Sequence, residues 1–93
     1  MKRLLLPTKP FLRSAKRLAK KNPTVAEDLR MTLELLAEDA FDPRLKTHKL
    51  KGNLAGSWAS SGGYDLRVVF QFVSHKDSEA ILLEAVGSHE EVY

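Results

Sequence analysis

The chain has 93 residues, 43% of them hydrophobic, which is enough for one compact domain with a single core and too little for two independent domains. We therefore expect one domain over residues 1–93. The absence of cysteine excludes disulfides, thiolate metal sites and thiol nucleophiles, so we expect a cytoplasmic protein. The net charge is only +3, but residues 1–21 carry eight basic and no acidic side chains, and residues 43–57 carry four basic and no acidic ones. Two acid-free basic stretches favour a polyanionic partner, although solvated helix and loop faces explain the charge equally well.

The chain is predicted to begin with a strand and an amphipathic helix. Residues 2–6 are expected to form the strand, because Pro7 ends an apolar run that is too short for a secretion signal or a membrane span. From Thr8 to Lys21 the spacing of apolar residues predicts a helix. Its apolar side holds Phe11, Leu12, Ala15, Leu18 and Ala19. Its basic side holds Lys9, Arg13, Lys16 and Lys20.

A second helix is predicted to begin at Asn22 and Pro23, which suit the N-cap and the first helical position. Its buried stripe holds Val25, Leu29, Leu33 and Leu36. So short a connection between two helices predicts an antiparallel helical hairpin. Pro43 limits the second helix, and the polar segment that contains Gly52 and Gly56 is expected to be an exposed loop.

The second half of the chain predicts strands. Residues 64–73 and 80–86 are rich in β-branched and aromatic residues, and the polar residues 74–79 between them are expected to form a hairpin turn. A short strand is expected over residues 57–60. The predicted fold is α+β, with the N-terminal strand and the antiparallel two-helix hairpin packed on one face of a small, mostly antiparallel β-sheet.

Three clusters hold residue types that can carry acid–base chemistry, at residues 47–52, 64–67 and 87–93. Their candidate catalytic residues are His48, Asp65, Arg67, His89 and Tyr93. Histidine exchanges protons near neutral pH, so it suits either proton-transfer role. None of the clusters is specific as a bare pattern, because a loop histidine is more often simply solvated and Asp65 with Arg67 can be a structural pair on one strand. His75, in the expected turn, is predicted to be solvated.

Other classes of site are excluded by spacing. The sequence has no glycine-rich phosphate loop, no HExxH pair, no zinc-ligand spacing of Cys and His, and no nucleophile elbow around its serines. We therefore expect neither a metal ion nor a cofactor.

Three strings, in their order and spacing, resemble the YafQ-like branch of the RelE/ParE superfamily. They are HKLKGNLAGSW at 48–58, YDLRVVF at 64–70 and LLEAVGSHEEVY at 82–93. The resemblance covers nearly the whole chain and implies a RelE-like fold and a toxin of a type II toxin–antitoxin system. It implies an endoribonuclease, an mRNA interferase that cuts message in the ribosomal A site and is silenced by a cognate antitoxin. The implied partners are thus that antitoxin, the 70S ribosome and mRNA, with no membrane.

The resemblance also assigns residues. His48 matches the histidine of the loop motif, Asp65 the strand aspartate and Arg67 a basic strand position. His89 matches the histidine of the terminal G-[ST]-H motif, and Tyr93 the aromatic residue four positions later. Some YafQ-like members carry a further histidine before the aspartate strand, where this chain reads ASSGG at 59–63. Which residue completes the acid–base pair is therefore left open.

Cutting RNA without a metal uses the 2′-hydroxyl of the substrate as nucleophile, so the protein must supply a base, an acid and cations. We assign His89 as general acid or base and His48 as its partner, with Asp65 orienting a histidine or contacting a base of the RNA. Tyr93 and Trp58 can stack on a nucleobase, although Trp58 also suits core packing. The expected contacts to RNA and ribosome are Lys9, Arg13, Lys16, Lys20, Lys46, Lys49 and Lys51.

Two alternatives remain from the sequence. A ParE-like toxin shares the fold but poisons DNA gyrase by binding, and it needs no catalytic histidine. A non-catalytic RNA-binding module would use the basic helix alone.

Overall fold

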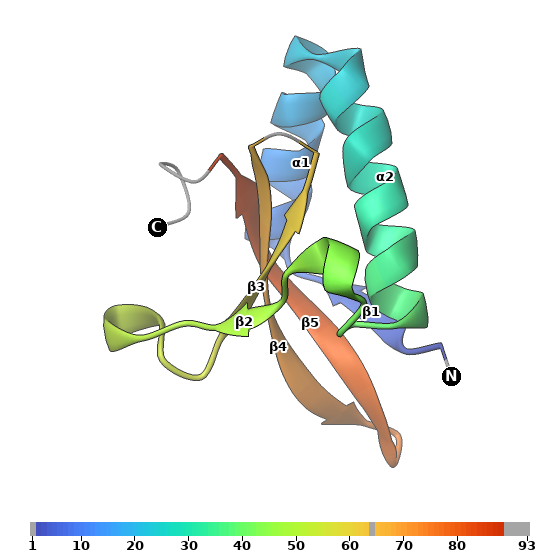
Figure 1. Ribbon diagram of the computed structural model, residues 1–93, viewed down its shortest axis with the longest axis vertical. Helices are drawn as coiled ribbons and strands as arrows, with labels where there is room; N and C mark the ends of the chain where they lie inside the picture. Colours follow the sequence, from blue (N-terminus) through green and yellow to red (C-terminus); the bar gives the residue numbers. More distant parts are fainter. Residues whose placement is uncertain (1, 64, 89–93) are drawn as a thin grey trace.

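The computed structural model describes residues 2–63 and 65–88, and Figure 1 shows a helical hairpin on one side of a twisted sheet. The helices of this part of the chain are α1 (Lys9–Lys21) and α2 (Pro23–Glu38), with short 3-10 helices η1 (Pro43–Leu45) and η2 (Gly52–Leu54). The strands are β1 (Leu4–Pro7), β2 (His48–Lys49), β3 (Trp58–Gly62), β4 (Leu66–His75) and β5 (Ser78–Gly87). No helix within the described ranges is long and apolar enough to cross a membrane.

Local capping explains where both helices begin. The Thr8 hydroxyl accepts a hydrogen bond from the Phe11 backbone N–H at 3.3 Å and donates to the Leu83 carbonyl at 2.9 Å, so one side chain caps α1 and fixes it to β5. Asn22 donates its backbone N–H to the Leu18 carbonyl, which ends α1. Its side-chain oxygen accepts from the Thr24 N–H at 3.0 Å, which caps α2. The predicted antiparallel hairpin and its Asn22 boundary are therefore confirmed.

The five strands form one sheet in the order β1-β5-β4-β3-β2. β1 pairs in parallel with β5, and the other neighbours are antiparallel, which confirms the predicted α+β class with a mostly antiparallel sheet. The β4–β5 turn is tighter than predicted, because the strands extend to His75 and Ser78 and only Lys76 and Asp77 remain between them. Both of these residues have positive φ, which is the geometry of a two-residue hairpin turn.

The sheet packs one face against the helical hairpin, and we call this the helix face. Val68 and Phe70 of β4 and Leu83 of β5 are buried there with Phe11 and Leu36 of the two helices. The predicted stripe of α1 was too wide, because Leu12 is 53% exposed and Ala19 is also exposed. At ~100° per residue these two positions fall between the buried stripe and the basic side, and α1 packs mainly against β5 and α2.

A glycine allows α2 to approach β3 closely. A Cβ atom added to Gly62 would lie 1.9 Å from Oγ1 of Thr32, so the two elements can meet here only because residue 62 has no side chain. The Thr32 hydroxyl is itself satisfied, since it donates to the Asp28 carbonyl at 2.6 Å. Gly62 is the last residue of β3, and Gly63 follows it in a turn with a positive φ.

A β-bulge divides β5. Val69 pairs with Ala85 and Phe70 pairs with Leu83, so Glu84 is the extra residue between them. Leu83 and Val86 are both buried on the helix face. Side chains alternate between the two faces along a regular strand, so residues three apart share a face only where a bulge interrupts that alternation. Gly87 consequently lies opposite Arg67.

Candidate active site

The strand register gathers candidate residues on the face of the sheet that points away from the helices, which we call the distal face. His48 pairs with Ala59, Ala59 with Val69, and Val69 with Ala85. Directly paired residues point to the same side of a sheet, and residues two apart on one strand do so as well. Arg67 therefore shares the distal face with His48, at a Cα separation of roughly 12 Å from the spacing of strands and residues.

The ring of His48 has a defined hydrogen bond. Its Nδ1 lies 3.0 Å from the carbonyl oxygen of Lys46. A carbonyl oxygen can only accept, so Nδ1 carries the proton, and in the neutral ring Nε2 holds the lone pair. The carbonyl is aimed by the left-handed backbone of Lys46, which has φ 50° and ψ 41° where η1 ends. This tautomer suits a proton acceptor.

Thr47 anchors the short strand that carries His48. Its hydroxyl donates to the Ala40 carbonyl at 2.6 Å, and the hydroxyl of the fully buried Ser60 lies 2.7 Å away. Because the Thr47 proton is used on Ala40, Ser60 is the donor in the second bond. The residue immediately before β2 is thus fixed to β3 and to the segment that follows α2.

Arg67 and Asp65 lie at the opposite end of the sheet from the β4–β5 turn. Arg67 is half-buried, pairs with Gly87, and donates from its guanidinium to the Leu66 carbonyl at 3.0 Å. Asp65 lines a cavity of about 340 Å³ together with Leu18 of α1 and Ser88. The structure therefore brings Asp65 and Arg67 to the start of the terminal motif. His89 and Tyr93 lie outside the described residues.

Comparison with known proteins identifies the family. The family described as a bacterial toxin of type II toxin–antitoxin systems, YafQ, matches residues 3–93. The chain belongs to the YafQ toxin family. No curated protein sequence gives a significant match.

Solved structures share the fold of this YafQ-family toxin. YafQ from E. coli is 17% identical, with a TM-score of 0.78 and 98% of both chains covered. The toxin of the E. coli DinJ–YafQ complex is 18% identical, with a TM-score of 0.75 and coverage of 100% of this chain and 99% of the other. YoeB from a Staphylococcus aureus dimer is 17% identical, with a TM-score of 0.72 and coverage of 96% and 99%.

The toxin's loop lysines do not form one group with His48. Lys49 pairs with Trp58, which pairs with Phe70, so these residues lie on the helix face. The Lys49 ammonium lies 5.5 Å from the centre of the Trp58 ring. Lys46 and Lys51 are exposed in the turns on either side of β2.

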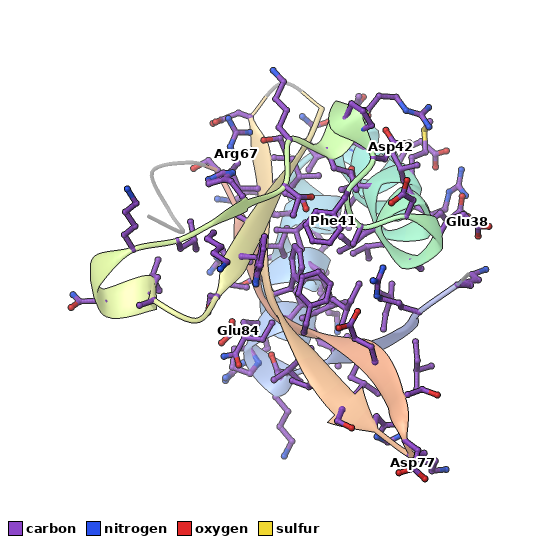
Figure 2. All side chains as sticks on the ribbon, turned by 60° about the horizontal axis from the view of Figure 1, so that its bottom comes forward. Glu38, Phe41, Asp42, Arg67, Asp77 and Glu84 are labelled. Atoms are coloured by element: carbon purple, nitrogen blue, oxygen red, sulfur yellow. The ribbon has the colours of Figure 1, made fainter. Side chains whose placement is uncertain are left out.

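Trp58 belongs to an aromatic cluster. Its ring packs edge-on against Phe41 at 5.5 Å and against Phe72 at 5.4 Å between ring centres. Figure 2 shows Phe41 on the side of the sheet opposite to Arg67 and Glu84. Of the two roles considered for Trp58, the structure supports packing.

The basic side of α1 is exposed as predicted. Its members are Lys9, Arg13, Lys16 and Lys20, all of which lie in water on the outer surface of the helix. None of them contributes to the hydrophobic core, so these cations are accessible to a polyanion.

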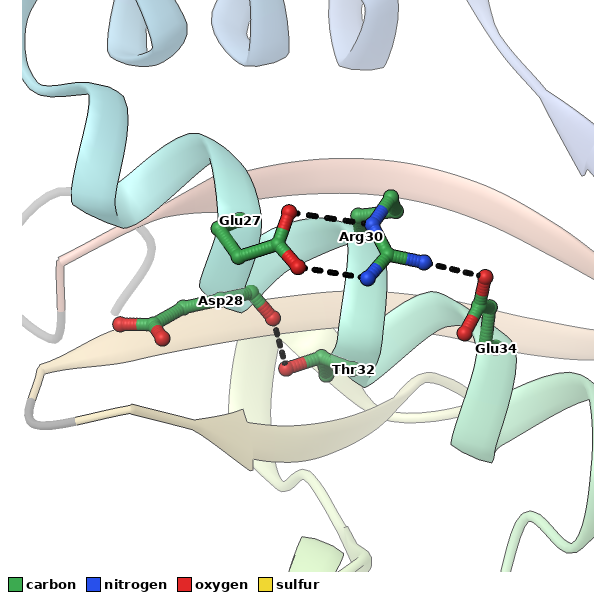
Figure 3. A network of polar contacts seen from close by, with 5 residues as sticks. All are labelled: Glu27, Asp28, Arg30, Thr32 and Glu34. Atoms are coloured by element: carbon green, nitrogen blue, oxygen red, sulfur yellow. Dashed lines mark hydrogen bonds and ion pairs between the residues drawn. The ribbon is translucent and has the colours of Figure 1, made fainter.

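The carboxyl groups whose pKa is shifted lie on α2 and at the N-cap of η1, away from the distal face. Hydrogen bonds from Arg30 lower the pKa of the Glu27 carboxyl, and the same guanidinium reaches Glu34 at 2.6 Å (Figure 3). Hydrogen bonds from Arg44 lower the pKa of the Asp42 carboxyl. Among the described residues, no group of three or more His, Asp and Glu side chains is arranged to hold a metal ion.

The sequence reasoning missed three polar residues on the distal face, Ser57, Gln71 and Glu84. They are joined by hydrogen bonds between residues that are 13 and 27 positions apart. No local motif marks such a group, because only the strand register brings its members together.

Proposed function

We propose that this toxin is a ribosome-dependent, metal-independent endoribonuclease that cleaves mRNA in the A site. The observation that carries the proposal is the location of His48 and Arg67 on the same face of the sheet, the distal face, with the Lys46 carbonyl leaving Nε2 of His48 as the acceptor nitrogen. The side chain of His48 is exposed on this face, and Arg67 is half-buried there, so both can be reached by an RNA strand. Membership of the YafQ toxin family supports the same proposed function.

The proposed reaction uses the RNA's own 2′-hydroxyl. Nε2 of His48 takes the proton of this hydroxyl, the 2′-oxygen forms a bond to phosphorus, and the bond from phosphorus to the 5′-oxygen breaks. An acid then protonates the leaving 5′-oxygen, and we assign this role to His89. The Arg67 guanidinium offsets the charge that develops on the phosphoryl oxygens. The products are a 2′,3′-cyclic phosphate and a 5′-hydroxyl.

We propose two macromolecular partners besides mRNA. The exposed cations of α1 are suited to the phosphates of ribosomal RNA. A cognate antitoxin is proposed as the inhibitor, by analogy with YafQ of E. coli, which has been crystallised in complex with DinJ.

The chemistry of the new RNA ends tests the proposal. We expect ends with a 2′,3′-cyclic phosphate, or the 3′-phosphate formed from it, in ribosome-bound message treated with the toxin. His48→Ala should lower the cleavage rate by about 10²–10⁴-fold, because it removes one proton-transfer group. His75→Ala is the matched control, since this histidine lies at the far end of β4, and it should cleave normally.

Other outcomes point to other functions. Ends with a 3′-hydroxyl would indicate a metal-dependent nuclease. Inhibition of DNA gyrase without RNA cleavage would indicate a ParE-like toxin, and binding of RNA without cleavage would indicate a non-catalytic module.

A further inference from the structure

A polar strap crosses the distal face, formed by Ser57, Gln71 and Glu84. The Glu84 carboxylate accepts from the Ser57 hydroxyl at 2.7 Å through one oxygen and from the Gln71 amide at 3.0 Å through the other. Glu84 belongs to β5, Gln71 to β4, and Ser57 immediately precedes β3. One carboxylate therefore links three consecutive parts of the sheet.

The strap begins at the β-bulge. Glu84 is the residue that has no partner across β4, and bulges often direct a side chain that regular pairing would place differently. Beyond the bulge, β5 continues with Ala85, Val86 and Gly87. Their alignment with β4 places Gly87 opposite Arg67. Holding Glu84 in place therefore also holds the end of β5 in this register.

At its other end the strap closes the loop that carries His48. The Ser57 carbonyl accepts from the Leu50 N–H at 2.9 Å, and the Ser57 N–H donates to the Leu54 carbonyl at 3.0 Å. β2 itself makes only two residue pairs with β3. The position of His48 relative to β4 thus depends on the conformation of the loop over residues 50–57. Ser57 holds that conformation, because both of these backbone hydrogen bonds involve it.

The chemical character of the strap favours positioning over packing. Ser57 is buried, yet its hydroxyl is turned to a carboxylate, while the neighbouring row on the same face is made of Ala59, Val69 and Ala85. An apolar side chain at residue 84 would fill the space equally well, but it would not fix the direction of Ser57. Directional hydrogen bonds specify one geometry, which is what an acid–base site requires.

We propose that Glu84 is a positioning residue of the toxin. Acting through Ser57, it fixes the loop that carries His48 relative to the strands that carry Arg67 and Gly87. The inference rests on the proposed function, because it assigns the purpose of this geometry to RNA cleavage.

Four variants test the strap. They are Glu84→Ala, Ser57→Ala, the double variant and Glu84→Gln, with Glu79→Ala as the matched control. Glu79 lies on the same strand, and its partner Arg3 is outside the strap. The rate constant kcat and KM for ribosome-bound mRNA are measured well below the melting temperature of every variant.

We expect each alanine variant to lower kcat by up to about 100-fold with little change in KM, since a shift of ~1 Å in a reacting group has an effect of this size. The double variant should be no slower than the slower single variant, because both changes break the same link. Glu84→Gln should recover part of kcat, since an amide can still hydrogen-bond Ser57 but cannot take a proton. Glu79→Ala should match the parent.

Two results would overturn the inference. If Glu84→Gln is as slow as Glu84→Ala while Ser57→Ala is fully active, Glu84 acts on the substrate directly. If both alanine variants keep the parental kcat and lose only thermal stability, the strap is merely structural.

A readout without RNA separates this inference from the proposed function. Hydrogen exchange of the Leu50 amide should accelerate in Glu84→Ala and not in Glu79→Ala, because opening of residues 50–57 exposes that N–H. If the parent toxin cuts no RNA but Leu50 exchange responds, the proposed function fails while the coupling of Glu84 to the loop remains. If Leu50 exchange does not respond, the coupling is wrong even where cleavage is observed.

Discussion

At the scale of single residues, the two ring nitrogens of His48 are made unequal by one backbone carbonyl. Lys46 is one of the few described non-glycine residues with positive φ, and this conformation costs about 1 kcal/mol for a residue with a side chain. The conformation turns the Lys46 carbonyl toward Nδ1 of His48. A small local strain thereby specifies which nitrogen can receive a proton, in the way that carbonyl partners orient histidines in many sites.

The tautomer of His48 can be observed directly. We expect nitrogen NMR spectra of the neutral ring to show the proton on Nδ1 of His48, because the Lys46 carbonyl accepts only from a protonated nitrogen. His75, which lies in the β4–β5 hairpin, provides a comparison within the same spectrum. A proton found on Nε2 of His48 would remove this histidine as the acceptor of the 2′-hydroxyl proton.

At the scale of elements, the sequence predicted the features that depend on neighbouring residues. Asn22 signals a helix boundary through its own backbone and side chain, so the hairpin was predictable. β2 was expected to be a loop, because its two residues are strand only through pairing with β3. The bulge at Glu84 was missed for the same reason, since it depends on how β4 and β5 are aligned.

The candidate site likewise has parts that the sequence predicts and parts that depend on the strand register. Residue type and family resemblance were enough to select His48 and Arg67, and the register then placed them on one face. The same sequence reasoning grouped Lys49 with His48, but alternation along β2 sends these neighbours to opposite faces. The Glu84 strap has no counterpart in local sequence, because its partners are distant along the chain.

The contact between α2 and β3 gives a prediction for stability. Gly62→Ala should lower the free energy of unfolding by about 1–3 kcal/mol, because the new methyl group would overlap Thr32 and force the two elements apart. The measurement is a urea titration. Combining it with Thr32→Ala should restore part of the loss, since Oγ1 is the atom in closest conflict.

Ser61→Ala controls for this stability prediction, because Ser61 is on the same strand but points to the distal face, opposite Arg67. It should change stability by less than about 0.5 kcal/mol. Equal losses for Gly62→Ala and Ser61→Ala would show that the close approach of α2 has no special cost.

At the scale of the whole molecule, the residues suited to docking and those suited to chemistry are on different surfaces. The cations of α1 lie on the outer side of a helix that packs on the helix face, whereas His48 and Arg67 lie on the distal face. Binding to the ribosome and cleavage of RNA should therefore respond to different substitutions. Arg13, Lys16 and Lys20 are the best test of docking, since their exposed heads can be changed without altering the core.

We expect the triple variant Arg13→Gln, Lys16→Gln and Lys20→Gln to bind ribosomes much more weakly at physiological salt, with a melting temperature close to that of the parent. If each side chain meets one phosphate, the slope of log affinity against log salt should flatten by about three units. A second triple variant, Lys2→Gln, Arg44→Gln and Lys76→Gln, removes the same charge from exposed positions elsewhere and should retain most of the affinity. His48→Ala should bind like the parent and fail to cut, because it leaves the docking cations intact. If the α1 variant binds as tightly as the parent across the salt titration, the basic side of α1 is only a solvated surface, and Lys46, Lys49 and Lys51 become the next candidates for docking.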